Sequence, residues 1–252
     1  MEKDIILEKK KLMDLAERSY GQNCYTFTGF LGLSEQSVFW DNVGELEYAG
    51  FSFFGGMENS ERKMLRFGKK DELGYEEEFP ICCIHVMPEM AKFADQLSHR
   101  DFLGALMNLG IERSILGDLL VKEKEAFLFC NQNMAEYICT NLDKVKHTSV
   151  RCRLVENPAE LPKQEPCMEQ IQVPSLRIDA CIAKVYRLSR TQVVEFFRAG
   201  KVFVDGRLCE NNSRNMKAGE VINLRGYGKF IFTGEMHETR KGKLSIEVGV
   251  YR

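Results

Sequence analysis

The sequence lacks the features of a membrane or secreted protein. None of its apolar runs approaches the ~20 residues of a bilayer-spanning helix. Residues 1–20 carry charges throughout, so they do not contain the apolar core of a secretory signal. We therefore expect a cytoplasmic protein that does not interact with a membrane.

The residue patterns of a metal site or a disulfide framework are also missing. The chain has nine cysteines, an odd number, and no two of them form a Cys-x-x-Cys pair. Its four histidines are scattered. Several cysteines lie inside apolar runs, namely Cys82, Cys83, Cys130 and Cys139. These features favour reduced, buried thiols, and we expect neither a metal ion nor a cofactor.

Charge is unevenly distributed along a chain of ordinary globular composition. The net charge is only −2, with 44% hydrophobic and 29% charged residues. Residues 174–252 hold 15 Lys and Arg against 8 Asp and Glu, a formal charge of +7, whereas the remainder carries −9. A basic segment on an acidic body predicts directional docking onto a polyanion such as RNA.

The most informative stretch, residues 175–229, predicts two short helices followed by strands. Apolar residues recur at helical spacing over residues 178–185. Ser189 and Gln192 predict a capping box at the start of the second helix. Arg190 then lies in the first helical turn, where free backbone N–H groups suit a phosphate.

A hairpin and a glycine-rich loop follow these helices. Asp205 and Gly206 predict a two-residue turn after a strand that begins at Lys201. The last strand leaves through residues 226–228, Gly-Tyr-Gly. Glycines there let a polyanion approach the backbone, and the Tyr227 ring suits stacking on a base.

Four segments carry a family resemblance: LRID (176–179), LSR (188–190), GKVFVDG (200–206) and AGEVINLRGYGKF (218–230). In order and spacing this stretch resembles an S4 RNA-binding domain. The family usually has Asn where this chain has Asp205. Both residues suit a type I′ turn, so the fold expectation stands, although the extra negative charge would weaken nearby RNA contacts.

The S4 resemblance implies an RNA-binding surface on the two helices and the loops after them. A scatter of Lys and Arg is in general only a solvated surface, but the matching positions of S4 domains contact RNA. We expect Arg190 and Arg225 to matter most. The RNA-binding candidates are Arg177, Lys184, Ser189, Arg190, Thr191, Lys201, Arg225, Tyr227 and Lys229.

Residues 77–156 predict a βαββαβ order, the ferredoxin-like arrangement that RRM domains also use. The predicted strands are 81–86, 118–122, 126–130 and 150–155, and the helices are 98–109 and 134–142. Phe127 and Phe129 alternate on the third strand, where RRM domains carry base-stacking rings. Because the RNP1 pattern is missing, we expect a neighbouring domain or the helices to cover both rings.

We expect an α+β protein with three folded regions. Residues 1–76 form a helical and hairpin region, with a helix at 4–20, a second helix capped by Ser34, strands at 48–54 and 61–67, and a loop at 68–78. The RRM-like domain at 77–156 follows. Three of the six prolines fall in residues 157–173, which we interpret as a linker to an S4 domain at 174–252. A polar turn at 236–243 and a closing strand at 244–250 complete the chain.

Two further segments, FFGGMENSERK (53–63) and SHRDFLGALMNLGIERSILGDLLV (98–121), resemble bacterial YlmH-type proteins, which carry an S4 domain after an RRM-like domain. The resemblance weakens in the first forty residues. It implies a non-enzymatic, ribosome-associated RNA-binding factor. S4-domain relatives bind the large ribosomal subunit when it carries peptidyl-tRNA and support rescue of stalled chains. We accordingly expect ribosomal RNA and peptidyl-tRNA as partners, no small-molecule substrate, and a monomer.

His99, Arg100 and Asp101 look like a catalytic cluster, but they lie in one helical turn where consecutive residues point in different directions. We interpret Ser98 and Asp101 as helix capping. We assign His99, Arg100 and Arg113 to a second surface that contacts RNA or protein.

Two other functions remain open. S4 domains also accompany RNA-modifying enzymes, such as pseudouridine synthases and rRNA methyltransferases. No Gly-x-Gly-x-x-Gly loop follows a strand here, and no pseudouridine-synthase Asp motif is recognisable. The second alternative is a protein-interaction module with a vestigial S4 domain, which the retained basic positions argue against.

Overall fold

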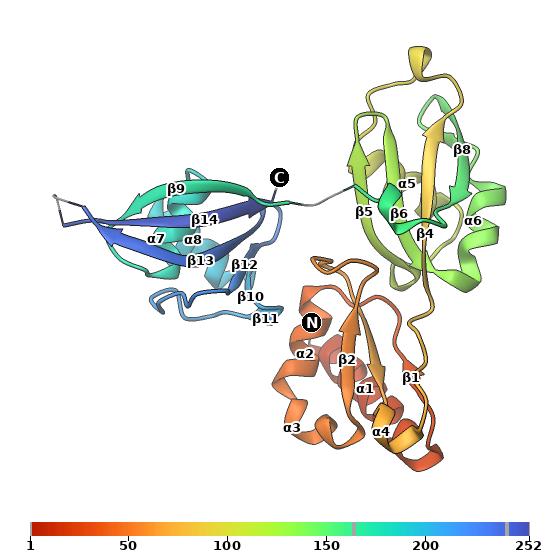
Figure 1. The fold of residues 1–252 in the computed structure, drawn as a ribbon, viewed down its shortest axis with the longest axis horizontal. Helices are drawn as coiled ribbons and strands as arrows, with labels where there is room; N and C mark the ends of the chain where they lie inside the picture. Colours follow the sequence, from red (N-terminus) through yellow and green to blue (C-terminus); the bar gives the residue numbers. More distant parts are fainter. Residues whose placement is uncertain (1, 163–164, 240–241, 252) are drawn as a thin grey trace. The chain divides into compact units, whose positions relative to one another are not determined.

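The computed structural model describes residues 2–162, 165–239 and 242–251 and shows an α+β protein with antiparallel sheets. The chain divides into two compact units, Met1–Lys163 and Gln164–Arg252 (Figure 1). Within the described ranges, no helix combines the length and the apolar character that a bilayer crossing needs.

The first unit begins with helices around a three-stranded sheet of order β1-β3-β2. The apolar stripe of the first helix supplies Leu12, which packs with Phe39 and Phe67 in a shared core. The elements of this region are α1 (Glu2–Gln22), β1 (Thr26–Phe27), α2 (Leu33–Asp41), α3 (Val43–Leu46), η1 (Glu47–Ala49), β2 (Phe51–Phe54), β3 (Met64–Phe67) and α4 (Lys70–Leu73).

Three local predictions in this region are wrong. The N-cap of α2 is Gly32 rather than Ser34. The strand expected over 48–54 begins only at Phe51, because Gly50 has a φ of +67°, which an extended strand does not tolerate. The loop expected at 68–78 contains the short helix α4.

The second region of this unit is a five-stranded sheet of order β5-β6-β4-β8-β7. Its hairpin turns at Glu123, which has a φ of +54°. The elements are β4 (Ile81–Pro88), α5 (His99–Asn108), β5 (Leu116–Lys122), β6 (Glu125–Asn131), α6 (Ala135–Asn141), β7 (Lys144–Val145) and β8 (Thr148–Leu154). Single-turn 3-10 helices lie between and after them: η2 (Ala91–Phe93), η3 (Arg113–Ile115), η4 (Gln132–Met134) and η5 (Pro158–Glu160).

The two faces of this sheet pack against different parts of the unit. Alternate strand residues such as Ile84 and Leu128 share a core with Leu106 of α5. The residues between them, including Phe127 and Phe129, are buried with side chains of the helical N-terminal region. The expectation that a neighbouring region covers both rings is therefore confirmed, and this sheet face is not available for base stacking.

A polar contact joins the N-terminal region to the sheet. The carboxylate of Asp118 in β5 accepts the backbone N–H groups of Glu61 (2.7 Å) and Arg62 (2.9 Å). The Arg62 guanidinium donates to the carbonyls of Leu116 (2.9 Å) and Phe30 (2.7 Å). These bonds tie the loop at residues 61–62 to the strand β5 and to Phe30.

The second unit is a six-stranded sheet of order β11-β10-β12-β13-β14-β9 with two helices packed on one face. Val193 and Phe197 of the second helix share the core with Phe230 from the sheet. The elements are β9 (Cys167–Val173), α7 (Ile178–Val185), α8 (Arg190–Arg198), β10 (Val202–Val204), β11 (Arg207–Leu208), β12 (Val221–Leu224), β13 (Gly228–Glu238) and β14 (Leu244–Tyr251).

The predicted linker is wrong over residues 167–173, which form the edge strand β9. This strand pairs with β14 from Val173↔Leu244 to Cys167↔Val250. The exposed Gln170 and Gln172 alternate with the buried Ile171 and Val173, but the alternation covers only four residues and is hard to recognise in the sequence. The prolines at 166 and 174 bracket the strand rather than mark an unstructured segment. Strand β13 likewise extends to Glu238, into the region predicted as a turn.

Candidate nucleic-acid interface

The helix pair of the second unit positions the main basic candidates. Arg177 is the N-cap of α7, and Arg190 is the first residue of α8. The Ser189 hydroxyl accepts the Gln192 N–H (3.2 Å), and the Gln192 side chain accepts the Ser189 N–H (2.9 Å). This capping box confirms the predicted start of α8. The exposed Ser189 hydroxyl thereby has an intramolecular partner, and its contact with RNA stays a prediction.

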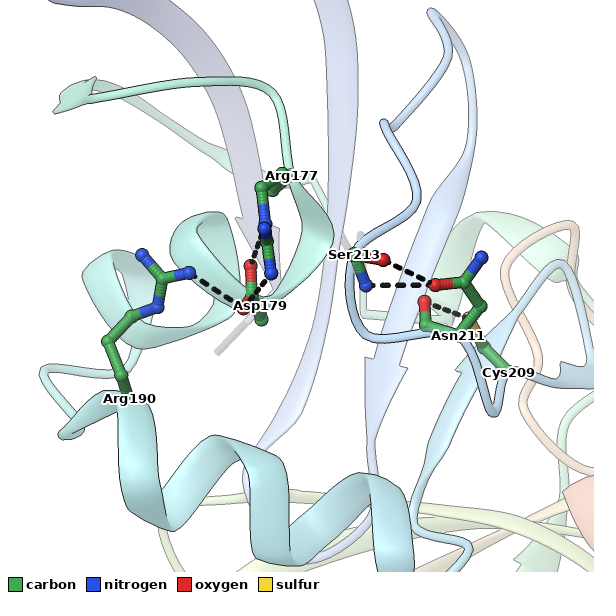
Figure 2. A network of polar contacts seen from close by, with 6 residues as sticks. All are labelled: Arg177, Asp179, Arg190, Cys209, Asn211 and Ser213. Atoms are coloured by element: carbon green, nitrogen blue, oxygen red, sulfur yellow. Dashed lines mark hydrogen bonds and ion pairs between the residues drawn. The ribbon is translucent and has the colours of Figure 1, made fainter.

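A buried carboxylate connects the two arginines (Figure 2). Asp179, in the first turn of α7, accepts Arg177 Nε (3.2 Å) on one oxygen. Its other oxygen accepts a terminal nitrogen of Arg177 (3.0 Å) and one of Arg190 (2.7 Å). The Asp179 side chain is 3% exposed, whereas those of Arg177 and Arg190 are 41% and 51% exposed. Two half-exposed guanidinium groups therefore lie at the surface, and the buried Asp179 carboxylate holds both of them.

The charge at this site is positive. Burial alone would raise the pKa of Asp179, but the hydrogen bonds and charges of Arg177 and Arg190 outweigh it and hold the pKa below the ordinary 3.8. The carboxylate is thus ionised at neutral pH. Two cations against one anion leave a net charge of +1 on a surface that water and ligands can reach.

Sequence reasoning missed Asp179. The signal was present in LRID, where an acidic residue stands two positions after Arg177 in the first turn of a helix. An acidic residue there is in general a solvated group that interacts with the helix dipole. Only the three-dimensional structure shows that Arg190, eleven positions away, meets the same carboxylate.

A second group of candidates gathers where α8 ends. Lys201 Nζ lies 5.6 Å from the centre of the Phe196 ring. The Tyr227 ring lies 5.3 Å from Phe196 and 5.8 Å from Tyr186, and Tyr227 is 47% exposed. The backbone N–H of Arg225 donates to the Lys201 carbonyl (2.9 Å). A half-exposed ring beside cationic residues is an arrangement that suits unpaired bases.

The remaining candidates do not join either group. Lys184, in the last turn of α7, and Thr191 are exposed. Lys229 lies over the Tyr251 ring at 4.8 Å. Because strand residues alternate and Phe230 belongs to the core under the helices, Lys229 lies on the opposite sheet face. Lys229 therefore does not share the face of the helix arginines, and its contact with RNA stays a prediction.

The predicted second surface is only partly present. Arg113 is turned inward: its guanidinium donates to the carbonyls of Leu116 (2.8 Å) and Gly117 (3.3 Å). Burial and the nearby Arg62 lower the pKa of Arg113 to about 10, so it is a structural cation rather than a contact residue. Desolvation and the charge of Arg113 lower the pKa of His99, which is therefore neutral at pH 7. Arg100 remains as an exposed cation.

The helix-capping interpretation next to this surface is confirmed. The Asp101 carboxylate accepts the Ser98 backbone N–H (2.8 Å) and the Ser98 hydroxyl (2.6 Å). It also pairs with Lys146 (3.2 Å). Within the described ranges, no three His, Cys, Asp or Glu side chains are grouped so that they would hold a metal ion.

Comparison with known proteins shows what the chain is similar to. Residues 75–158 match the family model described as "Putative RNA-binding domain in YlmH". The chain is 26% identical over 223 residues to ribosome-associated protein quality control protein P2 of Bacillus subtilis (strain 168), a match that covers 87% of this chain and 84% of that protein. The solved structure of cell division protein ylmH from Streptococcus pneumoniae is 19% identical with a TM-score of 0.49, over 63% of this chain and 95% of that one. The matched domain and the Bacillus relative confirm the resemblance to YlmH-type proteins that the sequence shows.

Proposed function

We propose that this protein is a non-catalytic RNA-binding factor that docks on ribosomal RNA and peptidyl-tRNA of the large ribosomal subunit and acts in quality control of stalled translation. The matched domain is described as RNA-binding, and the Bacillus relative is named for ribosome association and quality control. Within this proposal the second unit is an S4-type domain. The strand order β5-β6-β4-β8, with two helices on one face, supports a ferredoxin-like arrangement for the region before it.

The observation that carries the proposal is the pair Arg177 and Arg190, half-exposed on a shared carboxylate. Guanidinium groups match phosphate geometry and keep their charge at all physiological pH values. The exposed ring of Tyr227 beside Lys201 adds a surface for an unpaired base. The burial of Phe127 and Phe129 supports assigning the main RNA contact to the second unit.

Charge reversal tests this assignment. Arg190→Glu and Arg225→Glu should each reduce co-sedimentation of the full-length protein with large ribosomal subunits, because each places a negative charge against phosphate. Arg198→Glu is the matched control: Arg198 is exposed at the far end of α8 and pairs with Glu195 (2.7 Å). We expect the control to bind nearly as the wild type does. Wild-type binding by both reversal variants would remove this surface from the account.

The non-catalytic part of the proposal has its own test. Purified protein incubated with ribosomal RNA should leave the nucleosides unchanged, as judged by mass spectrometry of the digested RNA. Robust turnover would favour the RNA-modifying enzyme.

A further inference from the structure

The contacts of Asp179 define a further role within the proposed RNA-binding surface. We propose that Asp179 is a positioning residue that holds Arg177 and Arg190 together as a two-armed clamp for one RNA phosphodiester group. The inference rests on the proposed function, because it concerns how that surface binds RNA. In this proposal Asp179 increases the affinity for RNA without contacting RNA itself.

The clamp keeps most of its hydrogen-bonding capacity for a ligand. A guanidinium has five N–H donors. Arg177 uses two nitrogens on Asp179, and Arg190 uses one. The other donors lie on half-exposed side chains, in reach of an anion that arrives from solvent.

The backbone under Asp179 is fixed as well. The N–H groups of Ile178 and Asp179 donate to the carbonyls of Arg214 (2.9 Å) and Asn212 (3.3 Å). Figure 2 shows the loop that supplies them, in which the Asn211 side chain accepts both the N–H (3.0 Å) and the hydroxyl (2.8 Å) of Ser213. The backbone that carries the carboxylate is thus anchored to a loop that is ordered by its own side chains.

Holding an arginine before binding reduces the entropy that binding removes. A long side chain that is mobile in the free protein must be immobilised on the ligand, which weakens affinity by about threefold to tenfold per side chain. Asp179 orders two such side chains during folding. Its removal should therefore weaken RNA binding even though it also removes a negative charge from the surface.

The expected change in RNA affinity is opposite in sign to the change that net charge alone predicts. Asp179→Asn raises the net charge by one, so a surface that acts only through its total charge should bind RNA more tightly, with a steeper salt dependence. Loss of a positioned clamp should weaken RNA binding by about threefold to tenfold for each arginine that is released, with a salt dependence no steeper than that of the wild type.

The test uses the full-length chain and large-subunit ribosomal RNA labelled with a fluorophore, with affinity followed by fluorescence anisotropy over a salt series. The variants are Asp179→Asn, Arg190→Gln, both together, and Arg190→Lys. If Asp179 acts through Arg190, the effects of Asp179→Asn and Arg190→Gln will not add in the double variant. Arg190→Lys keeps the charge and the exposed position but loses the planar guanidinium that can bind Asp179 and a phosphate at the same time. This variant should also bind RNA more weakly.

The outcomes separate this inference from the proposed function. Weaker binding by Arg190→Gln together with tighter or unchanged binding by Asp179→Asn overturns the clamp and leaves the RNA-binding function standing. No binding by the wild type overturns both. Circular dichroism during thermal unfolding shows whether Asp179→Asn folds. If this variant does not fold, the affinity of Arg190→Lys provides the test. Wild-type affinity in Arg190→Lys would overturn the clamp.

Discussion

Thiol chemistry in this protein depends on how deeply each cysteine is buried. Burial raises the pKa of Cys83, Cys152 and Cys181 to about 12, so these thiols are almost wholly protonated at neutral pH. Cys167, at the start of the edge strand β9, is exposed. All nine cysteines are free in the structure.

We predict that a thiol reagent such as dithionitrobenzoate at pH 8 labels Cys167 in the fast phase and leaves Cys83, Cys152 and Cys181 unreacted until the chain unfolds. Only an accessible thiolate attacks the reagent. Cys167→Ser should remove one equivalent from the fast phase. Rapid labelling of Cys181 in the folded protein, detected by peptide mass spectrometry, would contradict the burial described here.

Asp179 makes stability depend on pH. Its folded-state pKa lies below the ordinary 3.8, so it stabilises the folded chain at pH above that value, and the contribution disappears as pH falls through the folded-state pKa. We predict that the wild type unfolds at a higher temperature than Asp179→Asn near neutral pH. The difference should shrink as the pH is lowered toward about 3. A difference that stays constant in thermal melts over this range would show that the carboxylate charge does not stabilise the fold.

At the residue scale, the sequence predicts which residues are basic but not how their side chains are held. The sequence predicts Arg113 as a surface cation, yet its guanidinium donates to carbonyls at the start of β5. Asp179 reads as an ordinary helix-terminal acid, yet two arginines converge on it. Such contacts depend on tertiary packing, which no local pattern encodes.

At the scale of elements, the stretch from α7 to β12 is predictable because its signals are local. The Ser189 capping box and the turn at Asp205 and Gly206, whose φ values are +49° and +78°, are each set by neighbouring residues. Strand β9 is different. Its identity depends on β14, some seventy positions later, and its exposed edge carries the polar residues that resemble a linker.

The packing of the N-terminal region on the sheet gives a prediction at this scale. Gly56 has a φ of +97°, and a Cβ there would lie 2.2 Å from Cδ1 of Phe129. Gly56→Ala should lower the free energy of unfolding by about 1–3 kcal/mol, through strain and through displacement of the ring. Chemical denaturation measures the change.

Gly104→Ala is the matched control. Gly104 lies within α5, and a Cβ there meets nothing within 4 Å. Alanine is a better helix former, so this variant should be neutral or more stable by up to about 1 kcal/mol. Equal stability of the two variants would show that the contact between Gly56 and Phe129 does not hold the two regions together.

At the scale of the whole molecule, the two units differ in surface charge and in which faces are buried. Arg177 and Arg190, which share a carboxylate at the surface, belong to the second unit, while the sheet face of the first unit that would suit base stacking is filled by its own N-terminal region. The sequence predicts this division from its charge asymmetry and from the missing RNP1 pattern. It does not predict the bonds between Asp118 and residues 61 and 62, which join positions more than fifty residues apart.

The central claim is that Arg177 and Arg190 bind RNA through its phosphates. The most direct measurement is the salt dependence of binding to large-subunit ribosomal RNA for the full-length wild type, the double variant Arg177→Gln/Arg190→Gln and the control Arg198→Gln. We predict lower affinity for the double variant, with the control unchanged. The slope of log K against log salt should become shallower by about one for each phosphate that the double variant no longer neutralises. Wild-type affinity and slope in the double variant would contradict the claim.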